Sequence, residues 1–148
     1  MSKIALKNGD DHAEAAAKHL DDSMELFSGG HFDGCAYLSG YVIECSLKSL
    51  ILVENGAPLP GKQHHRLEKL NLDWDTLRFS LAMASRTARY APAITTGHPV
   101  YDTTIGWKET IRYRPRGHVS ATVAASWLDE AKQVFGKTVA QMILNGDV

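Results

Sequence analysis

The chain has 148 residues, enough for one domain whose core needs neither a metal nor a disulfide. Hydrophobic residues make up 44% and charged residues 22%, which excludes a disordered chain and is ordinary for a soluble globular protein. The formal net charge of −1 excludes a strong overall field that would attract a nucleic acid or a membrane. We therefore predict a single domain that spans residues 1–148.

The charge is unevenly distributed along the chain. Residues 1–59 carry four Lys against nine acidic residues, a net charge of −5. Residues 60–118 carry ten Lys or Arg against five acidic residues, a net charge of +5. This asymmetry indicates a local contact with an anionic partner, and a solvated basic loop would explain the count equally well.

The first helix is expected to begin at Asp11, because Asp11 and Glu14 form a D-x-x-E capping box. Apolar residues then recur at helical spacing as far as Phe27, and Ser28-Gly29-Gly30 ends the helix.

The second helix is expected from His31 or Phe32 to Glu54, followed by Asn55-Gly56. It is apolar nearly all round, which is typical of a helix in the middle of a bundle. Cys35 and Cys45 lie in it about 15 Å apart, too far for a disulfide. We expect both to be buried thiols in a reducing compartment.

Residues 57–61, Ala-Pro-Leu-Pro-Gly, break the chain before a third helix. That helix is expected to begin near Asp73 and to end before Pro92. Its apolar positions would be Trp74, Leu77, Leu81 and Ala84 or Ala88. Residues 92–119 are interrupted by Pro and Gly and form a long loop, with one short helix around Thr104–Ile111; loops of this length are usually functional.

The last helix is expected to begin at Ser120, a good N-cap residue, and to end at Asn145-Gly146. No segment alternates with a period of two for long enough to be a strand. We therefore predict an all-α fold, an up-and-down bundle of four to five helices with the second helix at its centre. The N-terminus lacks a signal peptide, and no stretch approaches the ~20 apolar residues of a membrane span, so we expect a cytoplasmic protein with no membrane contact.

One segment of the second helix is distinctive. Residues 36–50 read AYLSGYVIECSLKSL and follow His31-Phe32-Asp33. This segment resembles the second helix of HEPN domains, and residues 107–113 and the helix from Ser120 also resemble that family. The resemblance spans roughly residues 11–144. It implies a HEPN-like bundle, often associated with toxin–antitoxin or defence systems.

The pair Arg112 and His118, with five residues between them, resembles the motif that HEPN ribonucleases use. It implies a metal-independent endoribonuclease with RNA as substrate. The chemistry suits these residues, because histidine shuttles protons near neutral pH and arginine holds a phosphate as its charge develops. Arg114 and Arg116 would add phosphate contacts.

The motif also departs from the family pattern. Pro115 and Gly117 interrupt it, whereas catalytic members present it near or within a helix. Ser120 stands where some HEPN toxins have the tyrosine that a nucleotidyltransferase antitoxin modifies. The alternative is therefore a non-catalytic HEPN module that binds a nucleotide, a nucleic acid or a protein. The protein partners that the resemblance implies are such an antitoxin and a second copy of the chain in a homodimer.

The remaining candidates have structural interpretations. Glu44 and Lys48 are four residues apart and favour an ion pair within the helix; alternatively, Lys48 binds a phosphate. His64-His65-Arg66 is expected to be exposed, because adjacent histidines point apart and cannot share a metal. The sequence has no phosphate-binding loop or dinucleotide motif, so we expect no cofactor and no metal.

Overall fold

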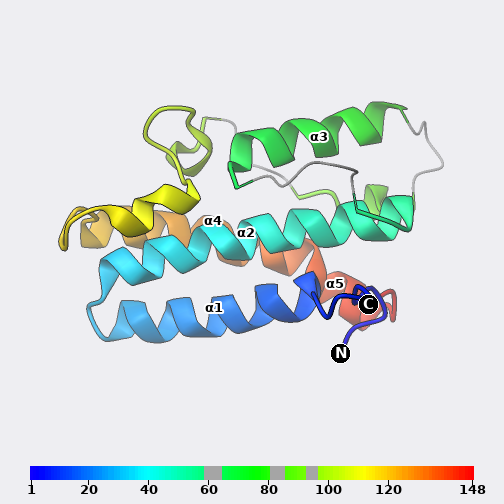
Figure 1. Cartoon of the computed structure of the whole chain (residues 1–148), viewed down its shortest axis with the longest axis horizontal. Helices are drawn as coiled ribbons and strands as arrows, with labels where there is room; N and C mark the ends of the chain where they lie inside the picture. Colours follow the sequence, from blue (N-terminus) through cyan, green and yellow to red (C-terminus); the bar gives the residue numbers. More distant parts are fainter. Residues whose placement is uncertain (59–64, 81–85, 93–96) are drawn as a thin grey trace.

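The computed structural model describes residues 1–58, 65–80, 86–92 and 97–148, without the side chains of Arg78 and Phe79. The described residues form helices and no strand, which confirms the all-α class and the helical bundle (Figure 1). The elements are α1 (His12–Ser28), α2 (Phe32–Asn55), α3 (Leu67–Ser80), α4 (Ala121–Lys137) and α5 (Val139–Leu144), with 3₁₀ helices η2 (Ala88–Tyr90), η3 (Pro99–Tyr101) and η4 (Glu109–Tyr113).

Caps set the helix ends where the sequence predicts them. The side chain of Asp11 accepts a hydrogen bond of 3.2 Å from the backbone N–H of Glu14, and α1 begins after it. Ser120 accepts one of 3.2 Å from the N–H of Val123 at the start of α4. Gly56 ends α2 in the left-handed conformation, with φ of 71°, which glycine adopts without strain.

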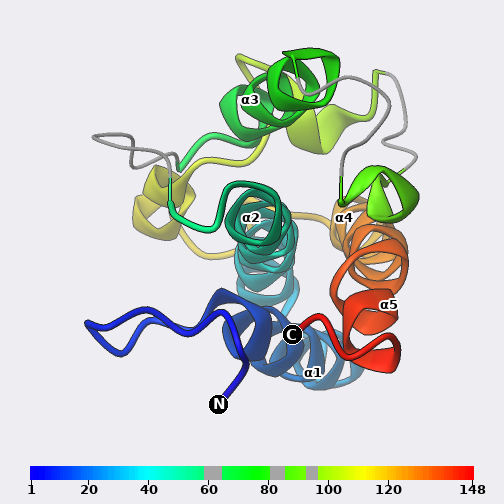
Figure 2. The same cartoon turned by 90° about the vertical axis from the view of Figure 1, so that its right-hand side faces the viewer.

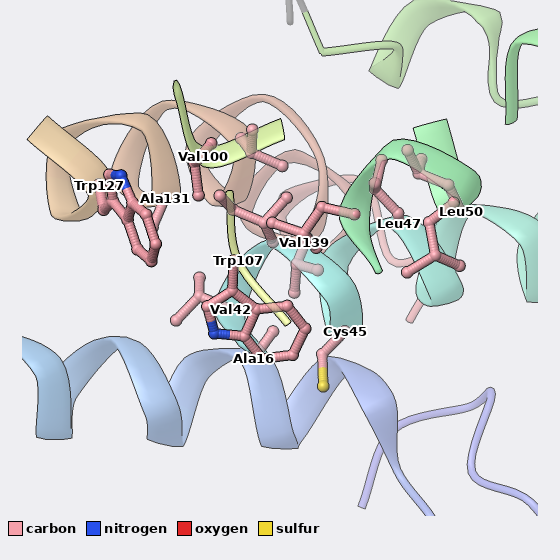
Figure 3. Packing of buried hydrophobic residues seen from close by; sticks show 14 of the residues in the cluster. Ala16, Val42, Cys45, Leu47, Leu50, Val100, Trp107, Trp127, Ala131 and Val139 are labelled. Carbon is pink, nitrogen blue, oxygen red and sulfur yellow. The ribbon is translucent and has the colours of Figure 1, made fainter. Parts of the chain in front are cut away.

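Helix α2 runs through the middle of the bundle. Figure 2 shows α1 on one side of it, α3 on the opposite side and α4 alongside. Between Val42 and Val53 every residue except Lys48 is buried. Figure 3 shows residues of α2 packed with Trp107 and with side chains of α1 and α4. Burial of each large apolar side chain stabilises the fold by about 1.5–3 kcal/mol, so α2 organises the core.

By length and composition alone, α2 is long and apolar enough to cross a membrane, which differs from our expectation. Its 18-residue window has a mean hydropathy of 1.3, and 78% of that window is buried inside the protein. A core helix that is apolar all round has this same composition. The packing of α1, α3 and α4 therefore already covers most of its apolar surface.

The strict up-and-down order holds for α1 and α2 but not for α2 and α4. Helix α4 begins beside the start of α2, where the N–H of Val119 donates to Asp33 at 2.9 Å, and runs in the same direction (Figure 1). The chain end that follows α5 lies near the N-terminus, where Lys3 donates to the carbonyl of Gly146 at 2.6 Å. The cause is the long connection from α2 to α4, which carries the chain back to the start of α2.

Two helices have bounds that differ from the prediction. Helix α3 begins at Leu67, six residues before Asp73, because Leu67, Leu70 and Trp74 form one buried stripe among polar residues. Leu81 and Ala84, also assigned to this helix, lie outside the described residues. The predicted last helix is divided at Thr138, whose hydroxyl donates to the carbonyl of Val134 at 2.6 Å and competes with the helical backbone pattern.

The short helix predicted around Thr104–Ile111 lies at Glu109–Tyr113 instead. Asp102 explains the shift, because its side chain accepts hydrogen bonds from the N–H groups of Thr104 and Ile105, at 2.7 and 2.8 Å. This Asx turn gives the backbone an alternative to a helix at that point.

Candidate functional site

Trp107 attaches the long connection to α2. Its indole N–H donates to the backbone carbonyl of Tyr37 at 2.9 Å, and its ring meets Tyr41 edge-on with centroids 4.7 Å apart. Gly40 leaves the space for the ring, because a Cβ there would lie 2.1 Å from two of its atoms. Residues 107–119 therefore start from a fixed point on α2.

Arg112 lies in η4 and contacts two tyrosines. Its guanidinium donates to the hydroxyl of Tyr37 at 3.4 Å and to that of Tyr113 at 2.9 Å, and it lies 4.8 Å from the Tyr113 ring centroid. The hydroxyl of Tyr37 in turn donates to that of Tyr41 at 3.3 Å. The two accepting hydroxyls raise the pKa of Arg112, so it is a permanent cation.

The ring of His118 is held through one nitrogen. Nδ1 lies 3.2 Å from the carboxylate of Asp33 and 3.2 Å from the carbonyl oxygen of Pro115. Both of these neighbours are acceptors, so we assign the ring proton to Nδ1 and the lone pair to Nε2. The side chain of His118 is 24% exposed. A histidine held in this way presents Nε2 as a base.

Asp33, in the first turn of α2, also fixes the backbone around His118. Its carboxylate accepts hydrogen bonds from the N–H of Gly117 at 2.6 Å and from that of Val119 at 2.9 Å. These two bonds favour the charged form and lower the pKa of Asp33. Gly117 has φ of 83°, a conformation that favours glycine. Asp33 is therefore a site residue to which the sequence alone assigns no role, since it lies just before the HEPN-like segment of residues 36–50.

Arg112 and His118 are thus anchored at neighbouring points on α2. Their partners Tyr37 and Asp33 are four residues apart, which puts them on one helix face, about 6 Å apart along the axis. Pro115 and Gly117 lie in the loop that returns the chain from one anchor to the other. The two side chains meet different surroundings, however, because His118 lines a groove that Arg112 does not line.

This groove has a volume of about 790 Å³ and lies between residues 99–119 and the first half of α4. Its basic lining residues are Lys108, Arg114 and His118, and its described lining includes no Asp or Glu. Arg116 instead lines a second hollow, of about 560 Å³, at the turn between α1 and α2. The predicted phosphate contacts Arg114 and Arg116 therefore lie on different surfaces.

Lys48 lies roughly 22 Å along α2 from Asp33, so the structure does not bring it to this site. It forms the predicted ion pair with Glu44 at 2.5 Å. Burial raises the pKa of Glu44, and Lys48 opposes that shift. His65, expected to be exposed, is half-buried with its Nδ1 3.2 Å from Glu44, because the buried carboxylate offers it an acceptor. His64 lies outside the described residues.

Cys35 and Cys45 are free and buried, as predicted. Burial raises the pKa of Cys35, and that of Cys45 to about 12, so neither is a reactive thiolate at neutral pH. Across the described ranges, no three His, Cys, Asp or Glu side chains cluster to hold a metal ion.

Comparison of the chain with models of protein families, with curated proteins and with solved structures finds no match. What these residues do is therefore inferred from their chemistry and geometry.

Proposed function

We propose that this protein is a HEPN-like, RNA-targeting protein that acts as a metal-independent endoribonuclease through Arg112 and His118. The observation that carries the proposal is the position of His118. Its Nδ1 lies against Asp33 and the Pro115 carbonyl, which leaves Nε2 as a proton acceptor beside a groove with basic residues. Proton acceptance by histidine is the step that cleavage of RNA by its own 2′-hydroxyl requires.

In the proposed reaction, Nε2 of His118 takes the proton of a ribose 2′-hydroxyl. The 2′-oxygen forms a bond to the adjacent phosphorus, and the bond from phosphorus to the 5′-oxygen of the next nucleotide breaks. That departing oxygen takes a proton from water. The products are a 2′,3′-cyclic phosphate and a 5′-hydroxyl.

Arg112 would hold the phosphate as charge develops on it. A guanidinium has five N–H donors, and the hydroxyls of Tyr37 and Tyr113 accept from two of its nitrogens. The remaining donors are available to phosphate oxygens. The tyrosine contacts would keep the exposed side chain in one orientation, which favours binding of a phosphate in a fixed geometry.

We also propose that the chain forms a homodimer in the cytoplasm, as part of a toxin–antitoxin or defence system. Exposed apolar side chains near the end of the chain support a homodimer, since Ile143 is 52% and Leu144 78% exposed. A two-fold interface would also bring two copies of the motif into one assembly. Light scattering should give twice the 16.3 kDa of the chain.

A second candidate function is a non-catalytic module that binds RNA or a nucleotide. The orientation of Arg112 favours it, because the guanidinium contacts tyrosines and does not line the groove beside His118. In this case the basic residues would hold a ligand without cleavage.

Incubation of the purified protein with total RNA in the presence of EDTA tests the first function against the second. Cleavage that leaves 2′,3′-cyclic phosphate ends supports the ribonuclease. RNA that is bound and recovered intact supports the binding module. Cleavage that stops in EDTA contradicts a metal-independent reaction.

A further inference from the structure

The groove beside His118 has the charge of an anion-binding site. Lys108 and Arg114 contribute basic side chains, and the hydroxyl-bearing residues Thr110, Thr122 and Ser126 belong to the same lining. No carboxylate in the described lining opposes them. A surface with these donors and no acid suits a phosphate-bearing ligand.

Two apolar side chains that line the same groove are open to solvent. Ile105 is 70% exposed and Val123 is 40% exposed, and both line it. They come from separate elements, because Ile105 follows the Asx turn of Asp102 and Val123 lies in the first turn of α4. Gly106 keeps this turn tight, since a Cβ there would lie 2.3 Å from the carbonyl oxygen of Asp102. Each of these two apolar side chains therefore stands on a backbone segment that is fixed by its own hydrogen bonds or packing.

We propose that this groove binds one unpaired nucleotide of single-stranded RNA next to the phosphate that is cut, with the base between Ile105 and Val123 and the backbone phosphates at Lys108 and Arg114. The position relative to the cut phosphate rests on the proposed function. A volume of about 790 Å³ suits a ligand of nucleotide size, since small-molecule pockets span about 300–1,000 Å³.

The groove selects single strands over duplexes. Bases of an RNA duplex are stacked and paired, and its deep major groove keeps side chains away from their edges. An unpaired base can leave the stack and contact the apolar side chains of the groove, while the adjacent phosphates contact the basic residues of the same lining.

The test measures fluorescence anisotropy with a short labelled 2′-O-methyl RNA, which lacks the attacking hydroxyl and is not consumed. Val123→Glu places a carboxylate in the apolar wall and completes an S-x-x-E capping box with Ser120, so the variant helix keeps its start. Leu72→Glu is the matched control, because Leu72 is 62% exposed on α3 and does not line the groove. We expect Val123→Glu to weaken single-strand binding about tenfold or more, and Leu72→Glu to leave it unchanged.

The contacts between basic residues and phosphates are tested separately, by the salt dependence of RNA affinity. Lys108→Ala should reduce the slope of log affinity against log salt concentration by about 0.7, the effect of one lost phosphate contact in a single strand. Lys137→Ala, at the far end of α4 and outside the groove, should leave that slope unchanged.

The outcomes separate this inference from the proposed function. If the wild type cuts RNA and Val123→Glu binds and cuts equally well, the groove does not hold the substrate and the ribonuclease stands. If the wild type binds single strands through Val123 and Lys108 but never cuts them, nucleotide binding by the groove stands and the ribonuclease fails. Equal affinity for the same RNA annealed to its complement, or a free 5′-nucleotide that binds as tightly as the strand, overturns the selection of an unpaired nucleotide in RNA.

Discussion

The carboxylate of Asp33 lies 3.2 Å from Nδ1 of His118 and accepts hydrogen bonds from the backbone on both sides of that histidine. One acid in the first turn of α2 therefore sets the position of the imidazole and of the loop that carries it. Asp33 acts through His118 and not on the substrate, so it is a positioning residue in the proposed reaction.

Asp33→Asn is expected to lower kcat about 100-fold, because the amide cannot accept from His118 and from both backbone N–H groups at once, and small displacements of a base are costly. KM should change less, since the groove remains. Asp129→Asn, an exposed acid on α4, is the matched control. The measurement is steady-state cleavage of a single-stranded RNA, and an unchanged kcat in Asp33→Asn would remove the positioning role.

The lowered pKa of Asp33 also predicts a pH dependence of stability. The pKa in the folded state lies below the ordinary 3.8, so the carboxylate stabilises the fold above that value and loses this contribution as the pH falls through its folded pKa. The difference in unfolding free energy between wild type and Asp33→Asn should be constant near neutral pH and shrink in acid below 3.8. Urea unfolding of both proteins across this range measures it, and a difference that grows in acid would contradict the assignment.

How far the sequence could predict these features depends on whether the signal is local. The ends of α1 and α2 follow from caps and glycines that lie beside them, and these predictions are confirmed. Leu67, Leu70 and Trp74 also recur at helical spacing, so the start of α3 at Leu67 has a local signal, and the predicted start near Asp73 leaves that signal unused.

The features of the site also divide into those that a local sequence pattern predicts and those that depend on contacts between distant residues. The spacing of Arg112 and His118 and the N-cap at Ser120 can be found by inspection of neighbouring residues. The partnership of Asp33 with Gly117 and Val119 joins residues 84 and 86 positions apart, and no local pattern in one sequence reports such a contact. The groove also depends on how residues 99–119 pack on α4. These residues form a loop without a repeating apolar pattern, so the sequence does not predict that packing.

Gly40→Ala is expected to destabilise the fold by about 2–3 kcal/mol, because the added Cβ would overlap the ring of Trp107 and force it away from α2. Cleavage should fall with it, since residues 107–119 lose their anchor. Gly136→Ala is the control within a helix, where a Cβ meets no atom within 4 Å. That variant should gain about 0.5–1 kcal/mol, and chemical denaturation gives both values. A Gly40→Ala protein as stable as wild type would show that Trp107 has room to move.

Arg112 and Arg116 should differ in their effects on RNA. Arg112→Ala is expected to abolish cleavage with little change in melting temperature, because it removes the donor for the developing charge. Arg116 lines the other hollow, so Arg116→Ala should weaken RNA binding in a salt-dependent way and leave kcat near that of wild type. Equal losses of kcat in both variants would show that Arg112 and Arg116 contribute only positive charge and no specific contact in the reaction.

The most direct test of the central claim is the cleavage rate of His118→Ala on single-stranded RNA in EDTA, beside that of the wild type and of His31→Ala, an exposed histidine at the start of α2. We predict that His118→Ala loses about 10²–10⁴-fold in rate, the usual effect of removing a general base. Its unfolding free energy should change by about 1 kcal/mol or less, because Asp33 still holds Gly117 and Val119. His31→Ala should cut as the wild type does. Cleavage by His118→Ala at the wild-type rate would contradict the assignment of His118 as the base.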